Sequence, residues 1–142
     1  MKLKIFTIGI IFLSLVLSSV QGYAQNTLDS LTVEAICPSS VRTGESVTIG
    51  LQVTNAPWAS ATAVINKSAL AALFPNGSIL GPFTIPISLS INPGQIVNVP
   101  NYMTFKMPAT SPANSVVGTT VSLCNNGFTD CGGGGCVIEV KP

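Results

Sequence analysis

The sequence contains no histidine and very little charge. Six of its 142 residues are basic and five are acidic, about a third of the charged fraction that is usual in globular domains. Without histidine, no Ser–His or Cys–His catalytic pair can form. The few cations are scattered along the chain, so they cannot neutralise a phosphate backbone or an anionic lipid surface. The composition therefore predicts no nucleic-acid partner and excludes the commonest nucleophilic mechanisms.

The acidic residues are equally sparse, and they argue against acid–base catalysis. A glycosidase needs two carboxylates on either side of a cleft. Only Glu34 and Glu139 lie in segments that we expect to be near one another, and their phase places both on a flat, solvent-facing side. We interpret them as two solvated charges. The chain is predicted to be no enzyme and to hold no cofactor and no metal.

Residues 1–24 have the pattern of a secretory signal peptide. Lys2 and Lys4 precede an apolar run over residues 5–20, and the small residues Gly22 and Ala24 precede the expected cleavage point. An uncleaved membrane anchor is the alternative, although this run is shorter than the roughly 20 residues that span a bilayer. Residues 25–142 then form one domain without a transmembrane segment. We expect it to be secreted, periplasmic or on the extracellular surface.

Period-two alternation dominates residues 25–142 and predicts β-strands with one face in a core and one in water. The expected apolar faces are Leu31, Val33, Ala35 and Cys37; Val47, Ile49, Leu51 and Val53; Ile85, Ile87, Leu89 and Ile91; Val97, Val99, Met103 and Phe105; Val117, Val121 and Leu123; and Ile138 and Val140. Turn residues separate these runs at 42–45, 75–77, 92–94 and 108–115. The predicted fold class is all-β, a single antiparallel β-sandwich of about seven strands.

Two segments depart from simple alternation. Pro86 lies within an apolar run, which predicts that its strand is an edge strand or begins there. Residues 68–74 instead predict one or two turns of helix. Ser68 is suited to cap it, an Ala-Leu-Ala-Ala-Leu stretch follows, and Pro75 would end it.

Residues 38–55 carry the pattern PSSVxxGESVTIxLxVTN. It resembles the first two strands of bacterial immunoglobulin-like domains, nearest in style to the adhesion-related class called CARDB. In those domains a Gly-Glu pair, here Gly44 and Glu45, turns the chain into the second strand, and an asparagine, here Asn55, begins the next loop. The resemblance implies an immunoglobulin-like sandwich. Four cysteines and a glycine tract depart from the family pattern, and a fold does not settle a function.

The four cysteines predict two disulfide bonds, because their number is even and the chain is expected to be exported. A structural zinc site is the alternative, but only Cys131 and Cys136 approach the usual ligand spacing. Cys37 and Cys136 are in phase with the inward residues of their strands, whereas Cys124 points outward. We therefore predict a Cys37–Cys136 bond between the first and last strands and a Cys124–Cys131 bond across the final loop.

Residues 125–136 (NNGFTDCGGGGC) are the least ordinary segment. Four consecutive glycines would expose bare backbone at an expected loop tip. One hypothesis is a binding loop with Phe128 as its apolar contact and Asn125, Asn126 and Asp130 as polar contacts. Calcium is a further hypothesis for these oxygens, but one carboxylate is too few for a tight site. The alternative is a long hairpin loop that needs cysteines and glycines to close.

Of two aromatic residues outside this segment, we expect Trp58 to be buried and Tyr102 to be exposed. Trp58 is a possible surface platform for sugar rings, but a domain that needs large core residues favours its burial. Tyr102 falls on the outward set with Asn98 and Thr104, and it is a candidate for surface contact.

Serine, threonine and asparagine contribute 34 of residues 25–142, against nine charged residues. Such a surface recognises partners by hydrogen bonding and shape rather than by charge. We expect a non-catalytic binding or adhesion module whose partner is a neutral protein surface or a glycan. The alternative is a structural or assembly subunit of an extracellular complex or filament. Low charge permits self-association, and exposed edge strands permit β-augmentation.

Overall fold

A computed structural model describes residues 30–126 and 131–142, and the alternating sequence forms eight strands there. They are β1 (Leu31–Ile36), β2 (Ser40–Arg42), β3 (Ser46–Asn55), β4 (Ala63–Leu73), β5 (Ile79–Ile91), β6 (Ile96–Lys106), β7 (Ser115–Cys124) and β8 (Cys131–Lys141). The predicted signal peptide lies outside the described residues. Within them, no helix is long and apolar enough to cross a membrane.

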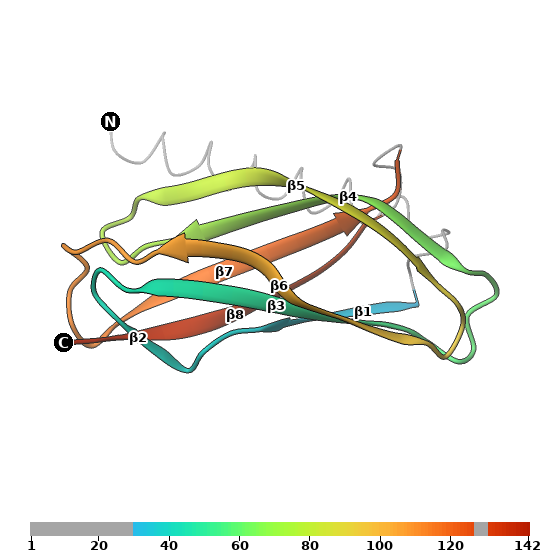
Figure 1. The fold of residues 1–142 in the computed structure, drawn as a ribbon, viewed down its shortest axis with the longest axis horizontal. Helices are drawn as coiled ribbons and strands as arrows, with labels where there is room; N and C mark the ends of the chain where they lie inside the picture. The colour runs from blue at the N-terminus through green and yellow to red at the C-terminus, as the bar shows by residue number, and fades with distance from the viewer. Residues whose placement is uncertain (1–29, 127–130) are drawn as a thin grey trace, which may run out of the picture.

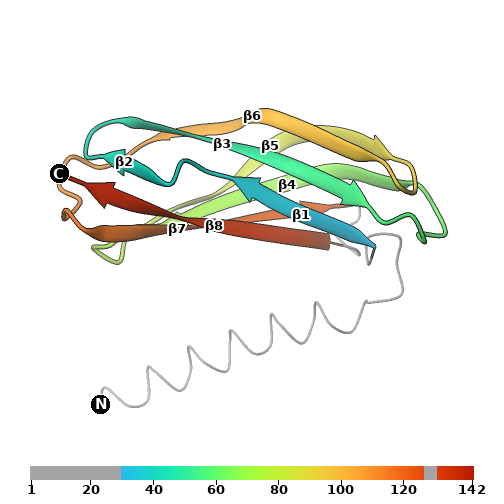
Figure 2. The ribbon, with the colours of Figure 1, turned by 90° about the horizontal axis from the view of Figure 1, so that it is seen from below.

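The strands form two sheets, with the orders β1-β3-β6 and β2-β8-β7-β4-β5 (Figure 1). Figure 2 shows the sheets as two layers, and together they make the immunoglobulin-like sandwich that the sequence predicts. All neighbouring strands are antiparallel except β2 and β8, which run parallel. Because β1 belongs to one sheet and β2 to the other, residues 37–39 carry the chain from layer to layer.

The core lies between the two sheets and contains most of the side chains that the alternation places inward. Fully buried examples are Val47, Ile49, Leu51 and Val53 of β3, Val117 and Leu123 of β7, and Ile138 and Val140 of β8. At one end of the core, Phe74 and Phe105 meet edge to face with ring centres 6.1 Å apart. The predicted turn at 42–45 is present, with Gly44 at a φ of 78°.

The predicted helix over residues 68–74 is wrong, because this segment is part of β4. Ser68, Leu70 and Ala72 are buried, which is the period-two pattern of a strand. Alanine and leucine favour a helix by only a few tenths of a kcal/mol per residue over most other residues. Here β4 pairs with both β5 and β7, so hydrogen bonds on two sides and burial of one face outweigh that preference.

Strand β5 confirms the position predicted from Pro86, because it is an edge strand of the five-stranded sheet. Pro82 lies in the same strand. The register between β4 and β5 shifts twice, between Ile65 and Lys67 and between Leu70 and Ala72. Prolines and bulges of this kind keep an edge strand from pairing with another chain.

Both predicted disulfide bonds are present. Cys37–Cys136 joins residues 99 positions apart and ties the segment after β1 to β8 in the other sheet. Cys124 and Cys131 are opposite one another on β7 and β8, with Cα atoms 4.1 Å apart. Among the described residues no free cysteine remains. Two disulfides indicate an oxidising compartment outside the cytoplasm.

The glycine tract is not a loop tip, contrary to the prediction. Residues 132–135 lie within β8 and pair with residues 120–123 of β7. A methyl group on Gly134 would overlap the backbone oxygen of Val33 in β1. The absence of a side chain at Gly134 therefore lets β1 of one sheet lie directly against β8 of the other.

Candidate functional site

The residues predicted to form a binding loop are not assembled into a site in the described part of the chain. Asn125 is half-buried and Asn126 is exposed at the end of β7. Phe128 and Asp130 lie outside the described residues. The glycines that were expected to complete the loop belong to β8.

Tyr102 is not on the surface, which corrects the prediction made from its phase. Between the pairs Leu51–Val99 and Ile49–Met103, β6 contains two more residues than β3. This bulge turns Tyr102 into the core, where it is 7% exposed. Among the described residues its hydroxyl has no hydrogen-bond partner within bonding geometry. The nearby Ser68 Oγ donates to the Ile85 carbonyl oxygen (2.6 Å). Burial raises the pKa of Tyr102, and the Ser68 hydroxyl opposes part of that rise.

Two pairs of outward polar residues in the three-stranded sheet are hydrogen-bonded to one another. Thr48 and Thr104 are joined by a 2.9 Å hydrogen bond between their hydroxyls. Gln52 Nε2 donates to Asn98 Oδ1 across β3 and β6 (3.1 Å). These cross-strand pairs stabilise the sheet face, and they leave fewer side-chain groups free to bind a partner.

Glu34 and Glu139 do not face a common cleft. Glu34 is exposed on β1 and pairs with Gln52 in the three-stranded sheet. Glu139 is exposed on β8 in the five-stranded sheet, opposite Val116. The described residues contain no group of three or more cysteine or acidic side chains able to hold a metal ion.

Trp58 is the most exposed large apolar residue in the described part of the chain, at 75%. Its predicted burial is wrong. Trp58 lies in the connection between β3 and β4, in a turn closed by a 3.0 Å hydrogen bond from Ala59 N to the Ala56 carbonyl oxygen. Pro57 precedes it and restricts the backbone of that turn. The side chain therefore projects from a short, constrained loop and is not part of the core.

Asn55 anchors this loop from inside the protein. Its side chain is fully buried and accepts a hydrogen bond from Ser30 Oγ (2.6 Å). Asn55 Nδ2 donates to the carbonyl oxygens of Ala61 (3.0 Å) and Ile91 (2.9 Å). One amide thus joins the start of β1, both ends of the β3–β4 loop and the end of β5. The sequence signal was present, since Asn55 ends the family-like pattern.

The turn between β5 and β6 lies beside the Trp58 loop, at one end of the long axis (Figure 1). Gly94 N donates to the Asn55 carbonyl oxygen (2.8 Å), and Asn55 N donates to that of Gln95 (3.0 Å). A Cβ on Gly94 would be 3.8 Å from the Pro57 Cα. We call residues 55–62 and 91–96 together the Trp58 end. No residue in these two segments is charged.

Two amide side chains of the Trp58 end are oriented by internal hydrogen bonds. Thr62 Oγ1 donates to Asn92 Oδ1 (2.8 Å). The backbone N of Asn92 donates to Gln95 Oε1 (3.0 Å). Both amide oxygens are therefore engaged, while Asn92 and Gln95 are exposed residues. Sequence reasoning missed this pair, because nothing in the pattern shows that the two turns are adjacent.

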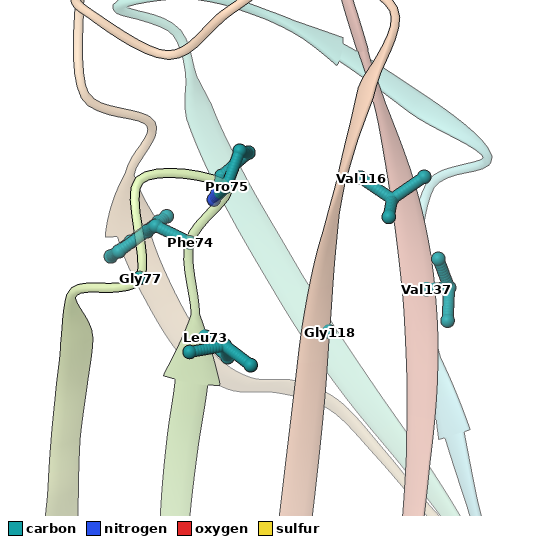
Figure 3. Close-up of a pocket in the computed structure, with 7 residues that line it drawn as sticks. All are labelled: Leu73, Phe74, Pro75, Gly77, Val116, Gly118 and Val137. Atoms are coloured by element: carbon teal, nitrogen blue, oxygen red, sulfur yellow. The ribbon is translucent and has the colours of Figure 1, made fainter. Parts of the chain in front are cut away.

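A second apolar feature lies at the opposite end of the molecule. An open groove of about 440 Å³ is bordered by the end of β4, by the β4–β5 turn, by the first residues of β7 and by the second half of β8 (Figure 3). We call it the apolar groove. The residues that line it are Leu73, Phe74, Pro75, Gly77, Val116, Gly118 and Val137. Leu73, Val116 and Val137 are each more than half exposed.

No protein-family model matches the sequence, and no curated protein matches it significantly. Solved structures share its fold. Spo0M, a sporulation control protein of Bacillus subtilis, matches with a TM-score of 0.58 and 18% identity, over 80% of this chain and 50% of that one. The DNA glycosylase AlkC of Pseudomonas fluorescens, bound to DNA with an abasic site analogue, matches with a TM-score of 0.50 and 11% identity, over 80% of this chain and 31% of that one.

The CARDB domain of the PF1109 protein of Pyrococcus furiosus, in complex with di-metal ions, is also similar. Its TM-score is 0.43 and its identity 15%, over 78% of this chain and 86% of that one. The chain spans half or less of the length of Spo0M and AlkC. At such identities the likeness concerns the fold, a β-sandwich that recurs in proteins with different activities.

Proposed function

We propose that this chain is a non-catalytic binding module, secreted, periplasmic or on the cell surface, that contacts a neutral partner through the Trp58 end. The observation that carries the proposal is the exposed Trp58 on a loop anchored by the buried Asn55. The two disulfide bonds and the expected leader support a location outside the cytoplasm.

A small domain loses folding stability when it leaves a tryptophan side chain exposed to solvent. Burying an apolar side chain of this size stabilises a protein by several kcal/mol, at about 25 cal/mol per Å² of apolar surface, and Trp58 forgoes that gain during folding. Tryptophan is also enriched among the residues that dominate binding energy. Because the loop is already fixed by hydrogen bonds, little conformational entropy is lost when a ligand covers the ring.

The absence of charge at the Trp58 end decides the kind of partner. Charged partners are attracted and selected by complementary potentials, and residues 55–62 and 91–96 offer none. Recognition there depends on apolar contact, hydrogen bonds and shape. A glycan or an uncharged protein surface fits this chemistry.

The test compares Trp58→Ala with Val137→Ala, which removes an exposed apolar side chain at the opposite end. Each variant is produced as residues 25–142, here called the mature chain. Its binding to envelope material and to culture medium from the native cells is measured by pull-down and by biolayer interferometry. Trp58→Ala should weaken binding at least tenfold, since hot-spot residues contribute roughly 2 kcal/mol or more, and Val137→Ala should leave it unchanged. Equal binding by wild type and Trp58→Ala would refute the proposal.

A second candidate function is that of an assembly subunit, favoured by the apolar groove. Exposed apolar patches of this kind are common interaction surfaces, and a second copy of this chain is the occupant to test. The groove is a better candidate for self-association than edge β5, which contains Pro82 and Pro86. Light scattering should then give a mass that rises with concentration, and Leu73→Ser should abolish this rise while Trp58→Ala does not. A constant monomer mass would exclude this function.

A further inference from the structure

We infer that the ligand of the Trp58 end is a neutral glycan rich in acceptor oxygens, bound by stacking on Trp58 and by the side-chain N–H groups of Asn92 and Gln95. This inference rests on the proposed function and specifies its ligand. It follows from the pairing of one exposed aromatic ring with two amides whose oxygens are already engaged.

Trp58 supplies a flat apolar surface of the right kind for a sugar ring. One face of a pyranose is lined by C–H groups with a small positive charge, and the face of an indole ring is negative. The 75% exposure of Trp58 leaves most of its ring open to such contact. Pro57 and the Ala59–Ala56 hydrogen bond hold the backbone on both sides of it, so the ring projects from a fixed position.

Asn92 and Gln95 supply more donors than acceptors. Asn92 Oδ1 is engaged by Thr62, and Gln95 Oε1 is engaged by the backbone N of Asn92. Each amide group has an oxygen with two lone pairs and an NH₂ with two N–H groups. One lone pair of each oxygen is used, so the two amides present more donors, at Nδ2 and Nε2, than acceptors. A matching ligand presents oxygens, as sugar hydroxyls and acetamido carbonyls do. The acetamido carbonyl is the better acceptor, which predicts a preference for N-acetylated sugars.

The small size of the apolar surface favours a glycan over a protein partner. A stable protein interface buries about 800 Å² on each side around an apolar centre. At the Trp58 end the large exposed apolar residues are Trp58 and Ile96, whereas the larger apolar cluster borders the groove at the opposite end. The lack of a cation in the two segments also excludes selection of an anionic polysaccharide.

The fluorescence of Trp58 gives a direct test, because it is the only tryptophan in the sequence. The mature chain is titrated with chitohexaose, with cellohexaose and with an anionic oligogalacturonate. Chitohexaose should shift Trp58 emission to shorter wavelength in a saturable way, with an affinity about fivefold above that for cellohexaose, the size of one extra hydrogen bond. Oligogalacturonate should have no effect.

Gln95→Glu is the matched variant for the amide donors. It keeps the Oε1 that accepts from Asn92 N but removes the NH₂ group, and a neutral sugar is not repelled by its charge. It should lower chitohexaose affinity about fivefold with an unchanged far-UV circular dichroism spectrum. Trp58→Ala should lower the affinity at least tenfold when binding is followed by calorimetry, and Trp58→Phe should recover part of it. Full affinity in Gln95→Glu would overturn the role of the donors.

Failure of this inference and failure of the proposed function give different results. If no neutral oligosaccharide shifts Trp58 emission, while envelope material still binds in a Trp58-dependent way after periodate destroys its sugars, the ligand is a protein and the glycan inference is wrong. If envelope material binds equally well with and without Trp58, the proposed function itself is wrong.

Discussion

The backbone oxygen of Val33 lies so close to Gly134 that it would overlap the Cβ of any side chain placed there. Val33 is in β1 of the three-stranded sheet and Gly134 is in β8 of the five-stranded sheet. The contact therefore closes the sandwich on the side that the Cys37–Cys136 bond also joins. The glycine tract that predicts a loop tip in the sequence is a site of close backbone approach in the fold.

Gly134→Ala should destabilise the domain by roughly 2 kcal/mol, the usual consequence of overpacking a tight contact. Gly132→Ala is the matched control, since its new methyl group would meet Leu31 and Val33 side chains at an ordinary 3.6 Å. That variant should be neutral or slightly stabilised, because alanine restricts the unfolded chain. Urea unfolding followed by far-UV circular dichroism measures both. Similar midpoints for the two variants would contradict the assignment of β1 against β8.

The two disulfide bonds should contribute unequally to stability. In the chain-entropy model, a cross-link over about 100 residues stabilises by about 4.7 kcal/mol and one over about eight residues by about 2.5 kcal/mol. The sequence separations here are 99 and 7. Replacing Cys37 and Cys136 by alanine should therefore lower the urea midpoint more than replacing Cys124 and Cys131. Peptide mapping without reduction checks the pairing, and a Cys124–Cys136 peptide would refute it.

Asn55→Ala should destabilise the domain by roughly 2–3 kcal/mol, because the buried carbonyl oxygen of Ile91 and the part-buried one of Ala61 lose this donor. The variant should also loosen the loop, so the fluorescence anisotropy of Trp58 should fall. Asn98→Ala removes an asparagine from an exposed cross-strand pair and should change stability by no more than about 0.5 kcal/mol. Unchanged anisotropy in Asn55→Ala would show that Asn55 does not anchor the loop.

Tyr102→Phe should stabilise the domain by about 1 kcal/mol at neutral pH, since it removes a buried hydroxyl that lacks a partner. Burial raises the pKa of Tyr102 above its ordinary value of 10.0. At pH values between the ordinary pKa of the unfolded state and the raised pKa of the folded state, the unfolded state binds fewer protons than the folded state. The free energy of unfolding must therefore fall as pH rises past about 10.

The fall in the urea midpoint between pH 8 and about pH 11 should therefore be smaller in Tyr102→Phe than in wild type. Both proteins share every other ionisable group, so the difference isolates Tyr102. In the mature chain Tyr102 is the only tyrosine, and absorbance near 295 nm follows its ionisation directly. An ordinary tyrosine titration would show that the hydroxyl is not buried.

Local alternation predicts much of this fold. The period-two pattern identifies the inward faces of β3, β7 and β8, because each strand presents alternate residues to one core. The same phase argument pairs Cys37 with Cys136 and Cys124 with Cys131. Pro86 indicates an edge strand, since it cannot donate to a neighbouring strand.

The candidate site was the part that alternation could not predict. Trp58 lies in a loop, where no periodicity indicates whether a side chain faces the core. The adjacency of that loop to Asn92 and Gln95 depends on hydrogen bonds between residues 30 and 36 positions apart in the sequence. Tyr102 was misplaced because it lies within a two-residue bulge of β6, where the alternation is interrupted, and a bulge is set by pairing with β3.

The charge-poor, histidine-free sequence by itself determined the all-β fold class, the disulfide pairing and the absence of charge in residues 55–62 and 91–96. Those properties follow from residue type and from the two-residue repeat of a strand. Only the tertiary structure decided that residues 68–74 are a strand, that Tyr102 is buried and that Trp58 is exposed. Each of these depends on which segments pack together, and burial and hydrogen bonding between distant segments outweigh the preferences of any single residue.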